Sequence, residues 1–335
     1  MSAIELLYRN IPDTSAKNVL ILNAQAHPLL NEICRQAASS LLQQSFKPSC
    51  IALSNSGLAW VNFVATDQYF DLILIHPAKN RQQTLFWMAD AMGRLQDGGK
   101  IVIACANNHG AKGYETALNK LAGNITSSSK SKCRIFSAIK SAALNSELAA
   151  QWLRNGEAQR ITSHGVISRP GLFSWDRPDC GSQLLLSCLD KPLSGEGADL
   201  CCGYGLLAVH LLRLSDQTSR IHLIEADQLA LCCAAQNTAA WSEQVETHWL
   251  DAATEPLPSK LDWVVCNPPF HTGHSHDVEL GQKIVTRACR SLKRGGSLYL
   301  VANRKLPYEH ILTAELRSVQ TLTEADGFKV MQGTR

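Results

Sequence analysis

The sequence predicts an α/β protein made of two tandem domains, each built on a mainly parallel sheet. The 335 residues are enough for two domains, and 45% of them are hydrophobic, which provides each domain with a core. Apolar segments of strand length alternate with segments of helical periodicity, as in parallel sheets covered on both faces. The same order of strands and turns occurs in both halves, which indicates a duplicated domain.

The second half shows the alternation most clearly. Turns and segments with apolar residues at helical spacing separate its apolar strands. Because helices connect most of these strands, we expect the strands to run parallel, with helices on both faces of the sheet. The expected strands are 198–202, 220–224, 247–250, 261–266 and 297–301, and the expected helices are 206–214, 228–240 and 280–292.

The first half repeats part of this order. In each half an acidic residue lies five positions before the residue that precedes proline, Asp71 before His76 and Asp262 before Asn267. A helical segment, a Gly-Gly pair and an apolar strand follow in both halves. However, no glycine turn follows the strand at 18–23, and histidine replaces asparagine before the proline. We therefore interpret the first domain as an inactive duplicate of the second.

The boundary between the domains is expected near residue 155. A Ser/Lys-rich segment covers 127–134, and 133–139 has the pattern of a last strand of the first domain. The segment 145–160 is interpreted as a connecting helix. The predicted domains span 1–155 and 156–335.

Composition excludes several classes of protein. The net charge is only +3, so the chain is not a strongly basic protein that coats polyanions. Lys130, Lys132 and Arg134 are interpreted either as part of a solvated linker or as phosphate contacts. No segment has the pattern of a signal peptide or a membrane span, so we expect a soluble, cytoplasmic protein. The twelve cysteines form no Cys-x-x-Cys pair and are interpreted as reduced core residues.

A glycine turn follows the first strand of the second domain. The segment from Asp199 to Gly205 joins this strand to a helix, and such a turn lets the backbone approach a nucleotide-like ligand. About twenty residues further on, Glu225 ends the next strand, where a carboxylate can accept hydrogen bonds from both hydroxyls of a ribose. The turn alone also fits a dinucleotide enzyme or a purely structural turn.

The second motif is Asn267-Pro268-Pro269-Phe270, directly after the apolar strand 261–266. The prolines fix backbone angles and remove amide donors, so the carbonyl of Pro268 and the side-chain oxygen of Asn267 can face one target. An exocyclic amine has two N–H donors to meet them, and its nitrogen lone pair would then point at an incoming methyl group. Phe270 supplies a face on which a base can stack. The structural alternative is a rigid loop after a strand.

Together these segments resemble the ribosomal RNA guanine-N2 methyltransferases, in particular the small-subunit type C family. The resemblance extends from Pro170 to the C-terminus, and the block of motifs is specific although no single piece is. Its segments are 170–174 (PGLFS), 181–186 (GSQLLL), 199–205 (DLCCGYG), 267–271 (NPPFH), 301–303 (VAN) and 306–308 (LPY).

The resemblance implies the fold and the reaction. It implies two Rossmann-like class I methyltransferase domains, a degenerate N-terminal one for RNA binding or support and a catalytic C-terminal one. The implied reaction transfers a methyl group from S-adenosylmethionine to the exocyclic N2 amine of a guanine in ribosomal RNA of the small subunit. The implied partner is ribosomal RNA or the small ribosomal subunit, with the chain acting as a monomer.

The resemblance also implies roles by position. The family usually has glycine at the position of Cys201, a departure that bears on cofactor affinity rather than on the fold. The implied cofactor-binding residues are Asp199, Cys201, Gly203, Gly205, Glu225, Asp251 and Asn267. The implied catalytic residues are Asn267, Pro268 and Phe270, and the implied substrate contacts are Pro269, Phe270 and His271.

Several alternatives remain open. The same proline loop serves adenine-N6 methylation and methylation of a glutamine side-chain amide, although those enzymes often carry tyrosine at the position of Phe270. The target could also be a guanine of the large subunit. A non-catalytic RNA-binding factor for ribosome assembly is supported by the inactive first domain and by Cys201. No metal is expected, because the sequence offers no further ligand to converge with His271, His274 and His276.

Overall fold

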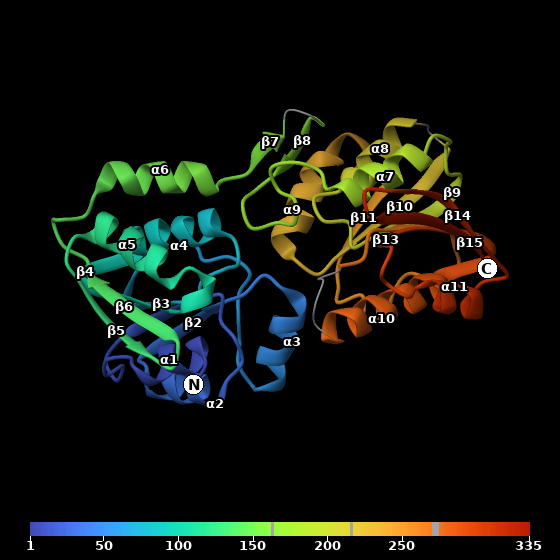
Figure 1. Cartoon of the computed structure of the whole chain (residues 1–335). Helices are drawn as coiled ribbons and strands as arrows, with labels where there is room; N and C mark the ends of the chain where they lie inside the picture. The colour runs from blue at the N-terminus through green and yellow to red at the C-terminus, as the bar shows by residue number, and fades with distance from the viewer. Residues whose placement is uncertain (162–163, 215–216, 270–274) are drawn as a thin grey trace. The chain divides into compact units, whose positions relative to one another are not determined.

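The computed structural model of the chain describes residues 1–161, 164–214, 217–269 and 275–335 (Figure 1). It divides into two compact units, Met1–Glu157 (unit one) and Ala158–Arg335 (unit two). The division lies two residues after the boundary expected at 155. Each unit has its own sheet and its own apolar core. Within the described ranges, no helix is long and apolar enough to cross a membrane.

Unit one contains a six-stranded sheet in the order β2-β1-β3-β4-β6-β5. The strands from β2 to β4 are parallel, whereas β6 and β5 run antiparallel to their neighbours. One core packs the sheet against α4, α5 and α6, and a second packs its other face against α1, α2 and α3. The strands are β1 (Asn18–Leu22), β2 (Ser39–Gln43), β3 (Phe70–Ile75), β4 (Leu95–Ala106), β5 (Ile125–Lys130) and β6 (Cys133–Ile139); the helices are α1 (Ala3–Arg9), α2 (Pro28–Gln36), α3 (Lys47–Asn55), α4 (Arg81–Arg94), η1 (Asn107–His109), α5 (Ala111–Ala122) and α6 (Ser146–Gly156).

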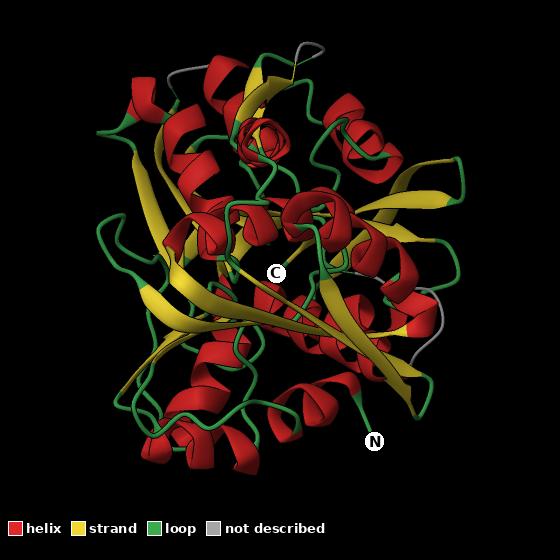
Figure 2. Cartoon of the chain, turned by 90° about the vertical axis from the view of Figure 1, so that its left-hand side faces the viewer, coloured by secondary structure: helices red, strands yellow, loops and turns green. Residues whose placement is uncertain are grey.

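Unit two contains a seven-stranded sheet in the order β11-β10-β9-β12-β13-β15-β14, preceded by the small ribbon β7-β8. Its strands are parallel from β11 to β13, and β15 and β14 are antiparallel. Helices α7, α8 and α9 cover one face and α10 and α11 the other; Figure 2 distinguishes helices from strands by colour. The strands are β7 (Gln159–Ile161), β8 (Val166–Ser168), β9 (Gly195–Leu200), β10 (Thr218–Glu225), β11 (Val245–Trp249), β12 (Leu261–Cys266), β13 (Leu292–Asn303), β14 (Ser318–Ala325) and β15 (Phe328–Thr334); the helices are α7 (Cys180–Cys188), α8 (Leu206–Leu214), α9 (Gln228–Asn237), η2 (Ala239–Trp241), α10 (Ser275–Ser291) and α11 (Glu309–Glu315).

The two sheets have the same strand order apart from one edge strand. The order β2-β1-β3-β4-β6-β5 corresponds to β10-β9-β12-β13-β15-β14, and within residues 1–157, all of which are described, no strand corresponds to β11. Single hydrogen bonds also correspond: Asp71 accepts one from the amide of Asn18 at 2.8 Å, and Asp262 accepts one from the amide of Glu196 at 2.9 Å. The expected duplication is therefore confirmed, and the acid before each proline loop ties two strands together.

The Ser/Lys-rich segment 127–134 is part of a β-hairpin, so its interpretation as a linker is wrong. Strand β5 pairs with β6, and Ser131 and Lys132 form the tight turn between them with φ of 52° and 60°. As an edge strand, β5 is exposed along most of its length, which accounts for its polar composition. Arg134 is ion-paired with Glu115, so Lys130 and Lys132 are the exposed cations of the hairpin.

Other expected boundaries shift by a few residues. The helix expected at 145–160 ends at Gly156, because Gln159–Ile161 pairs with β8 instead. The helix expected at 280–292 begins at Ser275. The strand expected at 247–250 is Val245–Trp249, whose pairing partner is β10. The strand 261–266 and the helix 206–214 have the expected bounds.

Candidate active site at the carboxyl edge of the second sheet

Those predicted site residues that the structure describes gather at one edge of the sheet of unit two. Strand β9 pairs in parallel with both β10 and β12, and β10 pairs in parallel with β11. The glycine turn follows β9, Glu225 ends β10 and Asn267 follows β12. Because parallel strands end at the same edge, the register brings these segments together where ligands of open α/β sheets bind.

The glycine turn requires unusual backbone geometry at three positions. Cys201, Gly203 and Gly205 have φ of 61°, 55° and 81°, the left-handed region that favours glycine. A Cβ placed on Gly205 would lie 3.1 Å from Cβ of Ala234, so this glycine allows α8 and α9 to pack closely. A Cβ placed on Gly203 would meet no atom within 4 Å, so the backbone at Gly203 faces open space.

Glu225 is held in one orientation by backbone amides. Its Oε1 accepts hydrogen bonds from the amides of Ala226 and Asp227 at 2.8 and 3.0 Å, and its Oε2 accepts one from Gly203 at 2.9 Å. Burial raises the pKa of the Glu225 carboxyl, and the hydrogen bonds from Asp227 and Gly203 oppose that rise. The carboxylate therefore links β10 to the glycine turn, and Oε2 retains a lone pair for a further donor.

Asp199 is a buried acid whose two carboxyl oxygens differ in their hydrogen bonding. Its side chain is 0% exposed, and Oδ2 accepts a hydrogen bond from the amide of Ala208 at 3.0 Å in the first turn of α8. Oδ1 has no hydrogen-bond partner among the described residues. Burial, and to a smaller extent Glu225, raises the pKa of Asp199 to about 7. A positively charged ligand group at Oδ1 would offset this cost of burying an ionised carboxyl.

Cys201 occupies the glycine-like position of the turn with its thiol pointing into the core. The thiol lies against that of Cys266, and this contact, followed by burial, raises the pKa of Cys201 well above its ordinary value. The thiol is therefore protonated at neutral pH, and Cys201 is not a nucleophile. The cost of a cysteine at this position is conformational, because a non-glycine residue adopts a left-handed backbone there.

Asn267 is oriented by the first turn of α7. Its Nδ2 donates a hydrogen bond to Oγ of Ser182 at 2.9 Å and lies 3.4 Å from both carboxylate oxygens of Asp179. Asp179 in turn caps α7 by accepting from the amide of Ser182 at 3.1 Å. Because the amide nitrogen is used in these contacts, the amide oxygen Oδ1 points elsewhere. It is buried and has no partner among the described residues. The geometry thus presents an oriented acceptor at the sheet edge.

The structure adds Asp179 and Ser182 to the residues named from the sequence. Ser182 belongs to a segment of the family resemblance, but its sequence position gives no sign that it contacts Asn267. The only local signal is an aspartate three residues before a serine at the start of a helix, which is typical of an N-cap. Their contact with Asn267 spans more than 80 residues and appears only in the fold.

The structure also describes the two prolines of the loop and Asp251. Pro268 is buried and Pro269 is exposed. Both carboxylate oxygens of Asp251 bind its own turn, Oδ1 to the amide of Ala253 and Oδ2 to the hydroxyl of Thr254. The predicted substrate contacts Phe270 and His271 lie outside the described residues.

The corresponding edge of unit one is closed by its own side chains. Asn23, at the position of Cys201, also has a positive φ, of 55°, and donates from Nδ2 to the carbonyl of His76 at 3.0 Å. Gln44 stands at the position of Glu225 and accepts from the amides of Ser45 and Phe46 at 3.0 and 2.9 Å. Its Nε2 donates to the carbonyl of Ala24 at 2.8 Å. An amide thus replaces the acid, as expected of an inactive duplicate, although no sequence motif marks Gln44.

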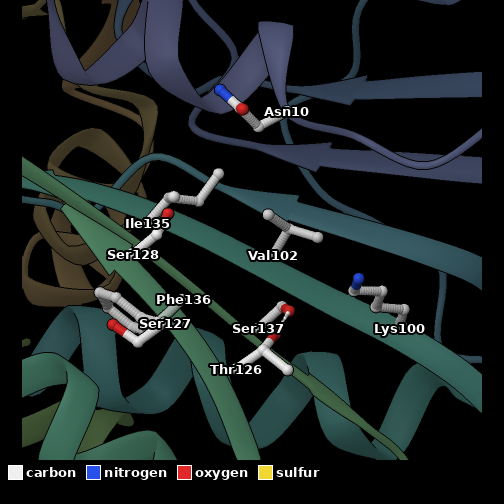
Figure 3. A pocket seen from close by; sticks show the side chains of 9 residues that line it. All are labelled: Asn10, Lys100, Val102, Thr126, Ser127, Ser128, Ile135, Phe136 and Ser137. Atoms are coloured by element: carbon white, nitrogen blue, oxygen red, sulfur yellow. Dashed lines mark hydrogen bonds between the residues drawn. The ribbon is translucent and has the colours of Figure 1, made fainter. Parts of the chain in front are cut away.

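Unit one also contains a cavity of about 210 Å³ away from this edge (Figure 3). It lies on the face of the sheet that α1 covers, over β4, β6 and β5. None of the predicted site residues line it. Its lining residues are Asn10, Lys100, Val102, Thr126, Ser127, Ser128, Ile135, Phe136 and Ser137.

Comparisons with known proteins place both units in one family. Family models described as the methyltransferase small domain and its N-terminal domain match residues 163–332 and 4–155. The ribosomal RNA small subunit methyltransferase C of Alteromonas mediterranea is 31% identical over 275 residues, which are 81% of this chain and 75% of that protein. The protein of the same name from Proteus mirabilis is 27% identical over 342 residues, 99% of this chain and 98% of that protein.

A solved structure supports the fold over the whole chain. A T. thermophilus 16S rRNA N2 methyltransferase in complex with AdoMet and guanosine superimposes with a TM-score of 0.82 at 22% identity, covering 99% of this chain and 91% of that one. The fold and the site define a methyltransferase with duplicated Rossmann-like domains. More specifically, the chain belongs to the ribosomal RNA small subunit methyltransferase C family.

Proposed function

We propose that this protein transfers a methyl group from S-adenosylmethionine to the exocyclic N2 amine of a guanine in small-subunit ribosomal RNA. The observation that carries this proposal is the oriented, unpartnered Oδ1 of Asn267 beside the glycine turn. An exocyclic amine is the complementary donor for such an acceptor. Family membership adds the substrate class, since the related proteins are named for ribosomal RNA of the small subunit.

The residues present fit S-adenosylmethionine. The open space at Gly203 admits a ligand close to the backbone, and the free lone pair on Oε2 of Glu225 suits a ribose hydroxyl. Oδ1 of Asp199 is a buried carboxyl oxygen without a partner among the described residues, and a cationic group of the ligand beside it would favour the ionised carboxylate. When bound, S-adenosylmethionine would supply a methyl group on a sulfonium sulfur, with a neutral thioether as the leaving group. The roles of Cys201, Gly205 and Asp251 in this site are proposed from the family resemblance.

The reaction requires alignment more than a strong base. Oδ1 of Asn267 and the carbonyl of Pro268 accept hydrogen bonds from the target amine and hold its nitrogen lone pair toward the methyl group. As the nitrogen becomes positive these two acceptors bind it more strongly, so they stabilise the transition state. The excess proton then leaves the nitrogen to water. Asp179 and Ser182 act indirectly, because they fix which atom of the Asn267 amide faces the substrate.

The substrate is held by residues of the proline loop and by unit one. Phe270 is proposed to stack on the base, with Pro269 and His271 beside it. Unit one is proposed to bind or support RNA, and the exposed Lys130 and Lys132 of its β5–β6 hairpin suit phosphate contacts. We further propose that the protein works as a monomer in the cytoplasm.

Mass spectrometry of ribosomal RNA from a deletion strain tests the proposal directly. We expect N2-methylguanosine to be lost at one position of the small-subunit RNA, and to return with the wild-type gene but not with Asn267→Ala. Loss of N6-methyladenosine, or of a modification in the large-subunit RNA, would redirect the assignment to another target. Unchanged ribosomal RNA together with a subunit-assembly defect would favour the non-catalytic alternative.

A further inference from the structure

Four polar side chains lie together on one face of the sheet of unit two, apart from the site residues. They are Glu196 on β9, His222 on β10, and Glu246 and His248 on β11. The register pairs His222 with Glu246, and residues two apart on a strand project from the same face. The cluster therefore occupies the β9–β10–β11 edge of the sheet, where β11 is the strand that unit one lacks.

The donor atoms of the two histidines and Glu246 converge. Nδ1 of His222 lies 2.8 Å from Nε2 of His248, and the Glu246 carboxylate reaches 3.7 Å from the first nitrogen and 3.6 Å from the second. Ligand atoms about 2.0–2.1 Å from a tetrahedral Zn²⁺ lie roughly 3.3 Å apart. The three separations bracket that value, so small side-chain shifts would place all three atoms on one ion.

Glu196 fixes the ring of His222 in the form that a metal needs. Its Oε1 lies 2.8 Å from Nε2 of His222, so Nε2 carries the proton that this carboxylate accepts. In the neutral ring, Nδ1 is then the nitrogen with the free lone pair, and it faces His248. A histidine that donates one ring N–H to a carboxylate and offers the other nitrogen inward is the usual arrangement at metal sites.

Burial and charge also favour a cation at this position. The His222 side chain is only 6% exposed and that of His248 20%, whereas both glutamates remain 49% exposed. The two glutamates outweigh the positive charge of Arg220, whose Nη1 lies 3.3 Å from Oε2 of Glu246.

We propose that His222, His248 and Glu246 form a binding site for one zinc-class divalent ion, with Glu196 positioning His222 and water completing the coordination. Two imidazoles and a carboxylate are a donor set that suits borderline ions such as Zn²⁺. The ion takes the place of the proton that lies between Nδ1 of His222 and Nε2 of His248. That proton moves to Nδ1 of His248, so the ring stays neutral. Binding clamps β11 to β10, about 10 Å along β10 from Glu225 at a rise of roughly 3.3 Å per residue.

Calorimetric titration of the chelator-treated full-length protein with Zn²⁺ tests the proposal. We expect one equivalent to bind in the wild type and to be lost in His248→Ala. Glu246→Gln changes only an exposed side chain, so it preserves the fold and should weaken binding as well. Glu196→Gln, which removes only the positioning carboxylate, should weaken binding about 10- to 100-fold. His310→Ala, at an exposed histidine of α11, is the matched control and should bind as the wild type does.

Cobalt(II) absorption separates this site from binding by the twelve cysteines. Ligation by imidazole and carboxylate gives only weak visible bands, whereas thiolate ligation adds an intense near-ultraviolet charge-transfer band. We expect the weak bands in the wild type and their loss in His248→Ala. The proposal is overturned if His248→Ala and Glu246→Gln bind the ion as tightly as the wild type, or if the one equivalent shows thiolate bands. The four residues are then only an internal hydrogen-bond network.

Discussion

Replacing Asn267 by alanine is expected to abolish turnover while leaving cofactor affinity nearly unchanged. The substitution removes Oδ1, which is buried and has no partner within the described residues, so no other contact of the fold depends on that atom. The amide nitrogen binds Ser182 and Asp179, and no hydrogen bond joins the side chain to Gly203 or Glu225 in the described part of the chain. The loss of Oδ1 should therefore fall on the substrate amine and not on the cofactor.

The size of the rate loss depends on whether the hydrogen bond to Oδ1 of Asn267 is stronger in the transition state than in the ground state. The acceptor binds an amine that is neutral in the ground state and positive in the transition state, so its removal lowers kcat more than it weakens binding. Removing one preorganised polar group of this kind costs roughly a hundred- to a thousandfold in rate. The alanine variant also leaves Ser182 without its partner, which affects the start of α7 but not the glycine turn.

Single-turnover methyl transfer to small ribosomal subunits from a deletion strain measures this effect, with cofactor binding followed by calorimetry in parallel. His76→Ala is the matched control, because His76 holds the corresponding position in unit one and should leave the rate unchanged. The reasoning is refuted if Asn267→Ala retains more than about a tenth of the wild-type rate, since the expected loss is at least roughly a hundredfold. The proline loop would then be a structural turn.

Three further predictions concern the same edge of the sheet. Glu225→Gln gives unit two the residue that Gln44 supplies in unit one, and we expect it to weaken cofactor binding more than about tenfold, or roughly 1.4 kcal/mol; an unchanged calorimetric Kd would show that another group holds the ribose. Ser182→Ala should lower kcat by about two- to tenfold, the value of one hydrogen bond, and have no effect in an Asn267→Ala background; additive losses would mean that Ser182 acts elsewhere. Burial raises the pKa of Asp199 to about 7 from 3.8, so its ionisation costs folding free energy that accumulates as pH rises between those values. Asp199→Asn should therefore raise the Tm of the cofactor-free protein above pH 7, raise it less near pH 4, and weaken cofactor binding; a Tm difference independent of pH would contradict this.

The sequence predicts the central strands and the helices between them well, because their patterns reflect burial on both faces. The strand 261–266 is almost entirely apolar and is followed by Asn-Pro, which cannot continue a central strand. The helix 206–214 begins directly after Gly205. In both cases the local signal and the tertiary environment agree.

The edge strands β5 and β14 are not predicted from the sequence, because they lack such a signal. Only the inner side of an edge strand pairs, and β5 and β14 are exposed along most of their length. Their polar residues therefore resemble a linker, and no apolar run marks them. The sequence also names Asn267 but not its orientation, which depends on Ser182 and Asp179 more than 80 residues away.

The closed polar edge of unit one has a thermodynamic consequence. Asn23 and Gln44 bond to their own unit, so the stability of unit one does not depend on a nucleotide, whereas Asp199 and Asn267 in unit two each keep an oxygen without a partner among the described residues. A ligand that binds only the native state stabilises it by RT ln(1 + [L]/Kd). By this linkage, S-adenosylmethionine should shift the melting of unit two and leave that of unit one in place. In a thermal scan of the whole chain, the transition of unit one would then serve as an internal reference, because the cofactor does not shift it.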